Sequence, residues 1–338
     1  MQPPSVKSPT SAAVERRRHA RLRYAIAQNV PLLLAYVVLG GMILVYVGLY
    51  VASTSYLPGS FELTSTLNNG MPLAFAGSGQ AVVVLTGGID LSIGGMVDLT
   101  NAVAAVAMRP DPGSIAVWSA VVLLIGAAGG LVNGLLVAFG RLQPILVTLA
   151  TLSIYQGLAI RVLPQPGGKV PGSFTATLTN PNAPIAFAWL AVLVVVWLVI
   201  RRTRLGVGIY AIGNDERASR AIGVRVRWVK VGAYVLGGVF AAAAGLYLAA
   251  TTTSGDATSG DVFTLTSIAA AVVGGVSFLG GRGSLVGALA GAFALTLLVN
   301  VLFFAHINPL YQSFYQGLFL ILAVLAAGLA WILLRRRR

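Results

Sequence analysis

Two aspartates stand inside an apolar stretch of this chain, where a charged side chain is costly. The run LTGGIDLSIGGMVDLTNAVAA (85–105) surrounds Asp90 and Asp98 with aliphatic residues and glycines. A carboxylate at the centre of a bilayer costs about 2.5–3.5 kcal/mol on insertion scales, so it requires a polar partner, a water-filled cavity or a position at the interface. These two residues are therefore the first candidates for a functional role.

Asp90 has a structural explanation close at hand. It follows Gly87 and Gly88, which favour a turn or a broken helix. In such a turn the Asp90 carboxylate can accept a hydrogen bond from the amide of Ser92 or Ile93 as the next helix begins. We expect Gly87, Gly88 and Asp90 to form a structural motif.

Asp98 lies deeper, and two interpretations of it stay open. It faces a translocation path, or it is buried against a threonine or asparagine of a neighbouring helix. Gln80, Asn101 and Asn133 also lie in apolar stretches. Amides pack helices together but can also pair with hydroxyl groups. We treat Asp98, Asn101, Gln80 and Asn133 as candidate path residues, and this set suits a neutral polyhydroxylated solute better than an ion.

Several chemistries are excluded by what the sequence lacks. It has no cysteine and only two histidines, His19 and His306, far apart in the chain. It contains neither the G-x-x-x-x-G-K-[ST] phosphate loop nor the H-E-x-x-H zinc motif. We therefore expect no enzyme activity, no metal site and no cofactor bound by this chain.

The composition predicts an all-α polytopic membrane protein. Hydrophobic residues make up 57% of the chain and charged residues only 9%, against roughly 25% charged in soluble domains. Judged against the ~20 apolar residues that cross a bilayer, we count about ten transmembrane helices and expect the glycine-rich second, third and eighth to be broken or re-entrant. The apolar stretches are 31–52, 67–86, 91–108, 115–139, 144–163, 184–200, 231–252, 262–279, 284–305 and 311–334.

The basic residues predict the orientation of these helices. With ten crossings, 20 of the 23 lysines and arginines fall on one side, including a basic tail at 1–29 and a basic end at 335–338. The positive-inside rule then places both termini in the cytoplasm and 30–334 in one transmembrane domain. The net charge of +14 has this explanation, so we do not expect nucleic acid as a partner. The proline-rich 163–184 segment is predicted to be an irregular external loop.

The polar segment 201–230 holds eight of the basic residues. Asn214 or Asp215 can cap a short helix there, Asp215 and Glu216 fill its first turn, Arg220 lies in its last turn, and Gly223 ends it. A basic loop that only fixes topology explains the charges but not these caps. We interpret the helix as a cytoplasmic coupling helix, through which a partner delivers mechanical work.

Three segments together resemble a known family. LTGGIDLSIGG (85–95), GVGIYAIGNDERASRAIGV (206–224) and AAAVVGGVSFLGGRGSLVGALAGA (269–292) are similar to the permease subunit of bacterial ABC importers of the ribose/xylose/galactose type. The resemblance implies a multi-pass permease in the bacterial cytoplasmic membrane that pairs with a second permease copy. It also implies a cytoplasmic ABC ATPase that binds the ATP, and an extracytoplasmic sugar-binding protein.

In that family the coupling helix would correspond to about 214–222. Gly213, Asn214, Ala218 and Gly223 match the family pattern, while Ser219 stands where a second alanine is common. The resemblance thus predicts a monosaccharide or a related polyol as the solute. The alternative is a proton- or cation-coupled secondary transporter that uses Asp98 and Asp90.

Overall fold

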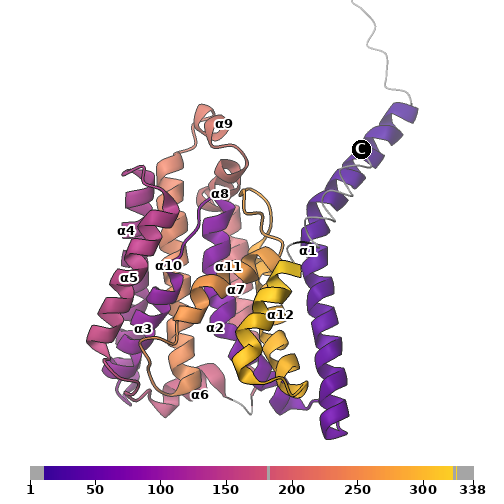
Figure 1. Cartoon of the computed structure of the whole chain (residues 1–338). Coiled ribbons are helices and arrows are strands. Elements are labelled where there is room, and N and C mark those ends of the chain that lie inside the picture. The colour runs from indigo at the N-terminus through magenta and orange to yellow at the C-terminus, as the bar shows by residue number, and fades with distance from the viewer. Residues whose placement is uncertain (1–10, 181–182, 323–324, 326–338) are drawn as a thin grey trace, which may run out of the picture.

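The computed structural model describes residues 11–180, 183–322 and 325, and these residues form a helical bundle without a β-strand (Figure 1). The elements are α1 (Ser11–Thr54), α2 (Ser60–Leu85), α3 (Ile93–Ala107), α4 (Pro112–Ala138), α5 (Pro144–Val162), α6 (Gly172–Thr179), α7 (Ile185–Arg202), α8 (Arg204–Asn214), α9 (Glu216–Ala221), α10 (Val226–Thr252), α11 (Asp261–Val273), α12 (Leu285–Phe304) and the 3-10 turn η1 (Pro309–Tyr311).

Six of the described helices are long and apolar enough to cross a membrane, and they are α1 from residue 30 onward, α4, α5, α7, α10 and α12. This confirms the predicted all-α polytopic membrane protein, while the count of about ten remains a prediction. The tenth apolar stretch is helical from Gln312 to Leu322, and most of its remainder, with the basic end 335–338, lies outside the described residues.

The predicted breaks fall in two of the three expected places. α3 has 15 residues and α11 has 13, so α11 rises only about 20 Å, less than the ~30 Å hydrocarbon core. The second stretch was expected to break as well, and this was wrong. α2 runs unbroken for 26 residues and accommodates Pro72 in its interior.

Glycines bring α4 and α10 into backbone contact. A Cβ atom added to Gly126 would lie 2.3 Å from the carbonyl oxygen of Gly238, and one added to Gly130 would lie 2.2 Å from that of Tyr234. One turn further along α4, Gly134 faces Val231 in the same way. The interface therefore requires residues without a side chain at these positions, as expected for small residues between membrane helices.

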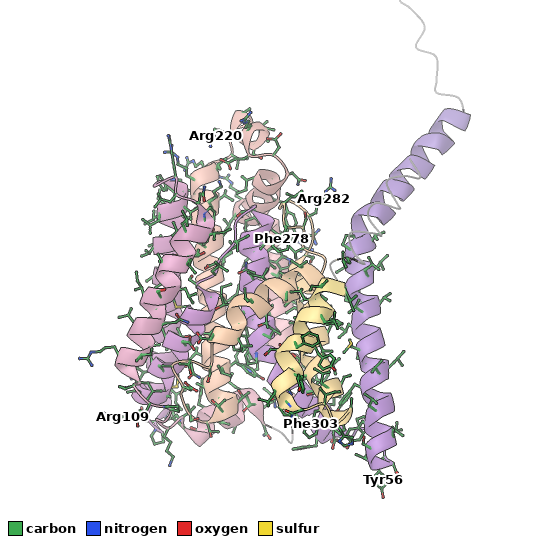
Figure 2. All side chains as sticks on the ribbon, viewed as in Figure 1. Tyr56, Arg109, Arg220, Phe278, Arg282 and Phe303 are labelled. Carbon is green, nitrogen blue, oxygen red and sulfur yellow. The ribbon has the colours of Figure 1, made fainter. Side chains whose placement is uncertain are left out.

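The two ends of the bundle carry different elements. α9 lies at one end, and α6 lies at the other, within the segment predicted to be irregular (Figure 1). Arg220 and Arg282 lie toward the α9 end, whereas Arg109 lies at the opposite end (Figure 2). These relative positions agree with the two sides assigned from the basic residues. α1 stands at the edge of the bundle beside α12 (Figure 1).

Candidate functional site: the α8–α9 loop and the buried polar residues

A short helix forms where the coupling helix is predicted, but it is one of two helices in the loop. α8 ends at Asn214, and α9 covers only Glu216–Ala221. Asp215 between them caps α9, because its Oδ1 atom accepts from the amide of Ala218 at 2.9 Å. Gly223 follows α9 with φ +88°, a conformation that costs glycine little. The predicted start and stop signals are thus both present, around a helix shorter than the expected 214–222.

Glu216 ties α9 to the start of α10. Its carboxylate accepts from the Lys230 ammonium at 2.7 Å and from the Arg220 guanidinium at 3.0 Å. The hydrogen bond from Lys230 is the main reason that the pKa of Glu216 lies below its usual range. Both ion pairs are partly exposed to solvent, so their role is to orient α9 more than to stabilise the fold.

The outer surface of α9 is available to a partner. Ala218, Arg220 and Gly223 are exposed, as is Arg217, whereas Ser219 is buried against the bundle. Ile222, directly after the helix, exposes 79% of its surface. An apolar side chain surrounded by arginines at the tip of a loop is the composition of a protein-binding surface.

Gly213 faces inward, where it meets Gly87, Gly280 and Gly281. We call these four residues the glycine junction. A Cβ atom on Gly213 would lie 1.9 Å from the carbonyl oxygen of Leu85 and 2.3 Å from the amide nitrogen of Gly281. One on Gly280 would lie 2.8 Å from the amide nitrogen of Gly87. Gly87, Gly280 and Gly281 all have positive φ. The three sequence segments that carried the family resemblance thus meet at one point.

Hydrogen bonds hold α8 against the loop between α11 and α12. The Gly281 amide donates to the Leu85 carbonyl oxygen at 2.9 Å. The Asn214 side chain donates to the Gly281 carbonyl oxygen at 3.2 Å, and the Tyr210 hydroxyl donates to that of Gly283 at 3.0 Å. These bonds connect α8 to the end of α2 and to the loop that follows α11.

Asp90 makes local hydrogen bonds at the start of α3. Its Oδ1 atom accepts from the Ser92 amide at 2.9 Å and from the Ser92 hydroxyl at 2.6 Å. Asn133 of α4 donates to the same hydroxyl oxygen at 2.8 Å. These three buried side chains form one hydrogen-bonded chain that ties the start of α3 to α4.

Asp98 is fully buried, but the partner is neither threonine nor asparagine. Its Oδ1 atom accepts a short hydrogen bond from the amide of Gly260, the residue that precedes α11. A carboxylate is favoured at this helix start, where free amides meet the positive end of the helix dipole. Asn101, one turn further along α3, accepts from the amide of Asp256 at 2.8 Å. Both residues thus anchor the 253–260 segment.

Gln80 is the least satisfied of the candidate path residues. It is 0% exposed, and neither atom of its amide group has a hydrogen-bond partner among the described residues. Gly77 contacts Ala270 of α11, and Val83 contacts Gly237 of α10. On α2, Gln80 lies three residues after Gly77 and three residues before Val83, so its side chain points between the directions of these two. Gln80 therefore faces the space between α10 and α11. Among the described residues, Asn133 bonds to Ser92, Asp98 and Asn101 hold the 253–260 segment, and no hydrogen bond joins Gln80 to any of them.

Comparison with known proteins decides the family. A family model described as "Branched-chain amino acid transport system / permease component" matches residues 62–324. The chain belongs to this family. The ribose import permease of Escherichia coli (strain K12) is 35% identical over 257 residues, which cover 73% of this chain and 79% of that protein. The autoinducer 2 import permease of Yersinia pseudotuberculosis is 34% identical over 251 residues, or 72% and 70% of the two chains. No solved structure matches the chain.

These matches confirm the resemblance to an ABC importer permease and the expectation of a transport subunit that is not an enzyme. They favour the importer over the ion-coupled alternative. Among the described residues, no group of three or more histidine, aspartate or glutamate side chains is arranged to hold a metal ion.

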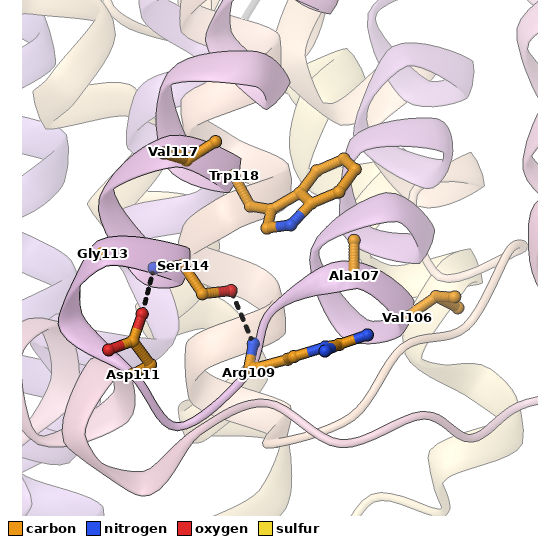
Figure 3. Close-up of a pocket in the computed structure, with 8 residues that line it drawn as sticks. All are labelled: Val106, Ala107, Arg109, Asp111, Gly113, Ser114, Val117 and Trp118. Atoms are coloured by element: carbon orange, nitrogen blue, oxygen red, sulfur yellow. Dashed lines mark hydrogen bonds between the residues drawn. The ribbon is translucent and has the colours of Figure 1, made fainter.

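A surface hollow of the permease at the end opposite α9 has no link to the predicted residues. It lies between the end of α3 and the start of α4 and includes Arg109 and Trp118 (Figure 3). Its polar groups serve local structure, because Asp111 accepts from the Ser114 amide at 2.8 Å and the Ser114 hydroxyl accepts from the Arg109 amide at 3.1 Å (Figure 3). We assign no function to it.

Sequence reasoning missed several residues that position the site of the permease. Tyr210 and the whole of α8 were read as part of a polar loop, because three glycines in RLGVGIYAIGN weaken a helix prediction. Ser92 was noted only as a possible amide donor, although its hydroxyl connects Asp90 to Asn133. Gln156 and Asp261 form a hydrogen bond between α5 and α11 that no local sequence signal indicates.

Proposed function

We propose that this permease forms the translocation path of an ATP-driven importer for a monosaccharide or a related polyol. The family description names branched-chain amino acids, but the first relative above is a ribose import permease at 35% identity over most of both chains. The buried polar groups of Gln80, Asn101 and Asn133 are neutral amides, and amides suit hydroxyl groups as both donors and acceptors.

The glycine junction is the observation that carries the mechanism. A cytoplasmic ATPase docks on α9, with Ile222 and the arginines around it as the contact surface. ATP is bound by that partner. Movement of α9 is transmitted by α8 to the contact of Gly213 with Leu85 and Gly281, and from there to α2 and to the two short helices α3 and α11. Relative movement of these elements alternates access to the path.

The remaining partners follow from this proposal. A second copy of the permease completes the path, and an extracytoplasmic sugar-binding protein delivers the solute to the end that carries α6. The chain lies in the bacterial cytoplasmic membrane with about ten crossings and both termini inside, as its basic residues indicate. Asp98, Asn101, Gln80 and Asn133 are candidate path residues in this arrangement.

The docking surface can be tested with one substitution and its matched control. Ile222→Asp places a charge at the centre of the proposed contact, and a loss of about 2 kcal/mol there weakens binding about thirtyfold. Leu57→Asp makes the same kind of change at the end opposite α9, at a residue of similar exposure, 75% against 79%. We expect Ile222→Asp to lose the co-purifying ATPase and ATP-driven ribose uptake.

Leu57→Asp should retain the ATPase. Equal recovery of the ATPase with both variants would remove α9 from the docking surface. Ribose uptake by the unsubstituted permease in liposomes without any ATPase would overturn the proposed function itself.

A further inference from the structure

Gln156 of α5 and Asp261 of α11 form a polar pair on the surface of the chain. The Gln156 amide donates a short hydrogen bond to the Asp261 Oδ1 atom. Asp261 is exposed and Gln156 is half-buried. Asp98 lies behind Asp261 in the bundle, because its Oδ1 atom accepts from the amide of Gly260, the residue before Asp261. A buried aspartate of α3 thus lies behind a surface pair formed by α5 and α11.

This position lies at the depth of the hydrocarbon core. α5 is a candidate membrane span of 19 residues, and Gln156 stands six residues before its end, or about 9 Å along the helix. Asp98 stands nine residues before the end of α3, about 14 Å from it. Asp261 is held at the same level, because the preceding Gly260 donates to Asp98. The pair is therefore well below the end of the bundle.

A carboxylate exposed at this depth cannot face lipid without a large cost. The insertion penalty is about 2.5–3.5 kcal/mol even where the side chain can reach toward the interface. The pair lies on a surface of mixed composition. Ser153 and Gly157 are exposed on α5, and the apolar Leu265 is exposed on α11. We call Ser153, Gln156, Gly157, Asp261 and Leu265 the α5–α11 face.

The outer side of α7 shows what a lipid-facing surface of the same chain is like. Val192, Val195 and Val199 are all exposed there, one turn apart, and no charged residue stands among them. The chain thus has two kinds of exposed surface at membrane depth, one purely apolar and one that carries an amide and a carboxylate.

We propose that the α5–α11 face lines the water-filled path, that the same face of a second copy forms the opposite wall, and that Gln156 and Asp261 present acceptors to the hydroxyl groups of the passing solute. This rests on the importer function proposed above. Asp98 lies behind this face, and its Oδ2 atom is buried without a hydrogen-bond partner among the described residues. One copy alone leaves this face open to lipid. A second copy is needed opposite it to enclose a path that contains water.

The absence of cysteine from the sequence makes a direct test possible. Single cysteines are introduced at Gly157, where an added side chain meets no atom within 4 Å, or at Leu265, which is exposed. A single cysteine at Val195 is the lipid-facing control. The full chain with its ATPase, in liposomes, is treated with a membrane-impermeant methanethiosulfonate reagent. This reagent modifies thiolates, which form in water but not in hydrocarbon.

We expect Gly157→Cys and Leu265→Cys to react about a hundredfold faster than Val195→Cys, because an apolar environment that raises the thiol pKa by about two units removes that fraction of thiolate. Modification of Leu265→Cys should also block ATP-driven uptake of radiolabelled ribose. If both cysteines react no faster than the one at position 195, the face is not lined by water and the inference is overturned.

Uptake before modification separates this inference from the proposed function. If the unmodified variants import ribose and yet fail to react, the importer stands and the assignment of its path to this face is wrong. If the unsubstituted protein shows no ATP-driven uptake of ribose at all, the proposed sugar importer function fails, whatever the labelling rates are.

Discussion

The substitution Gly213→Ala adds a single methyl group at the glycine junction. That methyl carbon would lie 1.9 Å from the Leu85 carbonyl oxygen and 2.3 Å from the Gly281 amide nitrogen. Both neighbours are backbone atoms, which cannot rotate away as the end of a flexible side chain can. α8 must therefore separate from the end of α2, from the loop after α11, or from both.

The cost of this separation can be worked out from three contributions. Overpacking costs about 1–3 kcal/mol. Loss of the 2.9 Å hydrogen bond from Gly281 to Leu85 costs about 0.5–1.5 kcal/mol. Alanine favours the helical conformation of α8 more than glycine does, which offsets about 1 kcal/mol of this cost. The net effect is about 2 kcal/mol, which shifts the equilibrium between joined and separated states about thirtyfold.

Two measurements check this prediction. Hydrogen exchange of the Gly281 amide reports the junction itself and should accelerate about thirtyfold. The amount of ribose imported per ATP hydrolysed by the full complex should fall at least about tenfold, because a separated junction no longer transmits the movement of α9. Gly41→Ala in α1 is the matched control, since a Cβ atom there has no neighbour within 4 Å. Wild-type exchange at Gly281 together with wild-type coupling in Gly213→Ala would refute the reasoning.

Three further predictions concern single side chains. Glu216→Gln removes both ion pairs and should loosen α9 by at most about 1 kcal/mol, seen as faster hydrogen exchange there. Because Lys230 lowers the pKa of Glu216, the wild type should show the same loosening only in acid, below the ordinary glutamate value of 4.5, and loosening of the wild type near pH 7 would contradict this. Gln80→Leu removes a buried amide that has no hydrogen-bond partner in the described part of the chain, so thermal stability should stay equal or rise while ribose uptake falls; unchanged uptake would exclude Gln80 from the path. Asn133→Ala should lower the free energy of unfolding by about 1–3 kcal/mol, because Ser92 loses its donor, and a melting temperature equal to that of the wild type would argue against the hydrogen-bonded chain.

The local signals in the sequence were sufficient to predict the short helix α9. Asp215 caps α9 and Gly223 ends it, as the residue types indicated. Hydropathy predicted the apolar part of the long helices but not the polar turns that extend beyond it. α10 begins at Val226, five residues before the predicted start, because a helix can continue beyond the apolar stretch with Arg227 and Lys230 on its surface.

The contacts between distant segments could not be predicted from the sequence. Gly87, Gly213 and Gly281 are each separated by more than sixty residues, and nothing in their local sequence indicates that they touch. The pairing of Gln156 with Asp261 is of the same kind. Gly213 matches the coupling-helix pattern of the family, but its sequence does not indicate that it faces the interior, where a larger side chain would meet the backbone of Leu85 and Gly281.

The backbone contact between α4 and α10 limits how the molecule can deform. The two helices touch over three successive turns, at Gly126, Gly130 and Gly134, with no flexible side chain between them to absorb sliding. A rotation of one helix against the other would bring backbone atoms into steric conflict, so α4 and α10 should move as one rigid unit. We expect the transport cycle to move this unit as a whole, while the short helices α3 and α11 shift relative to it.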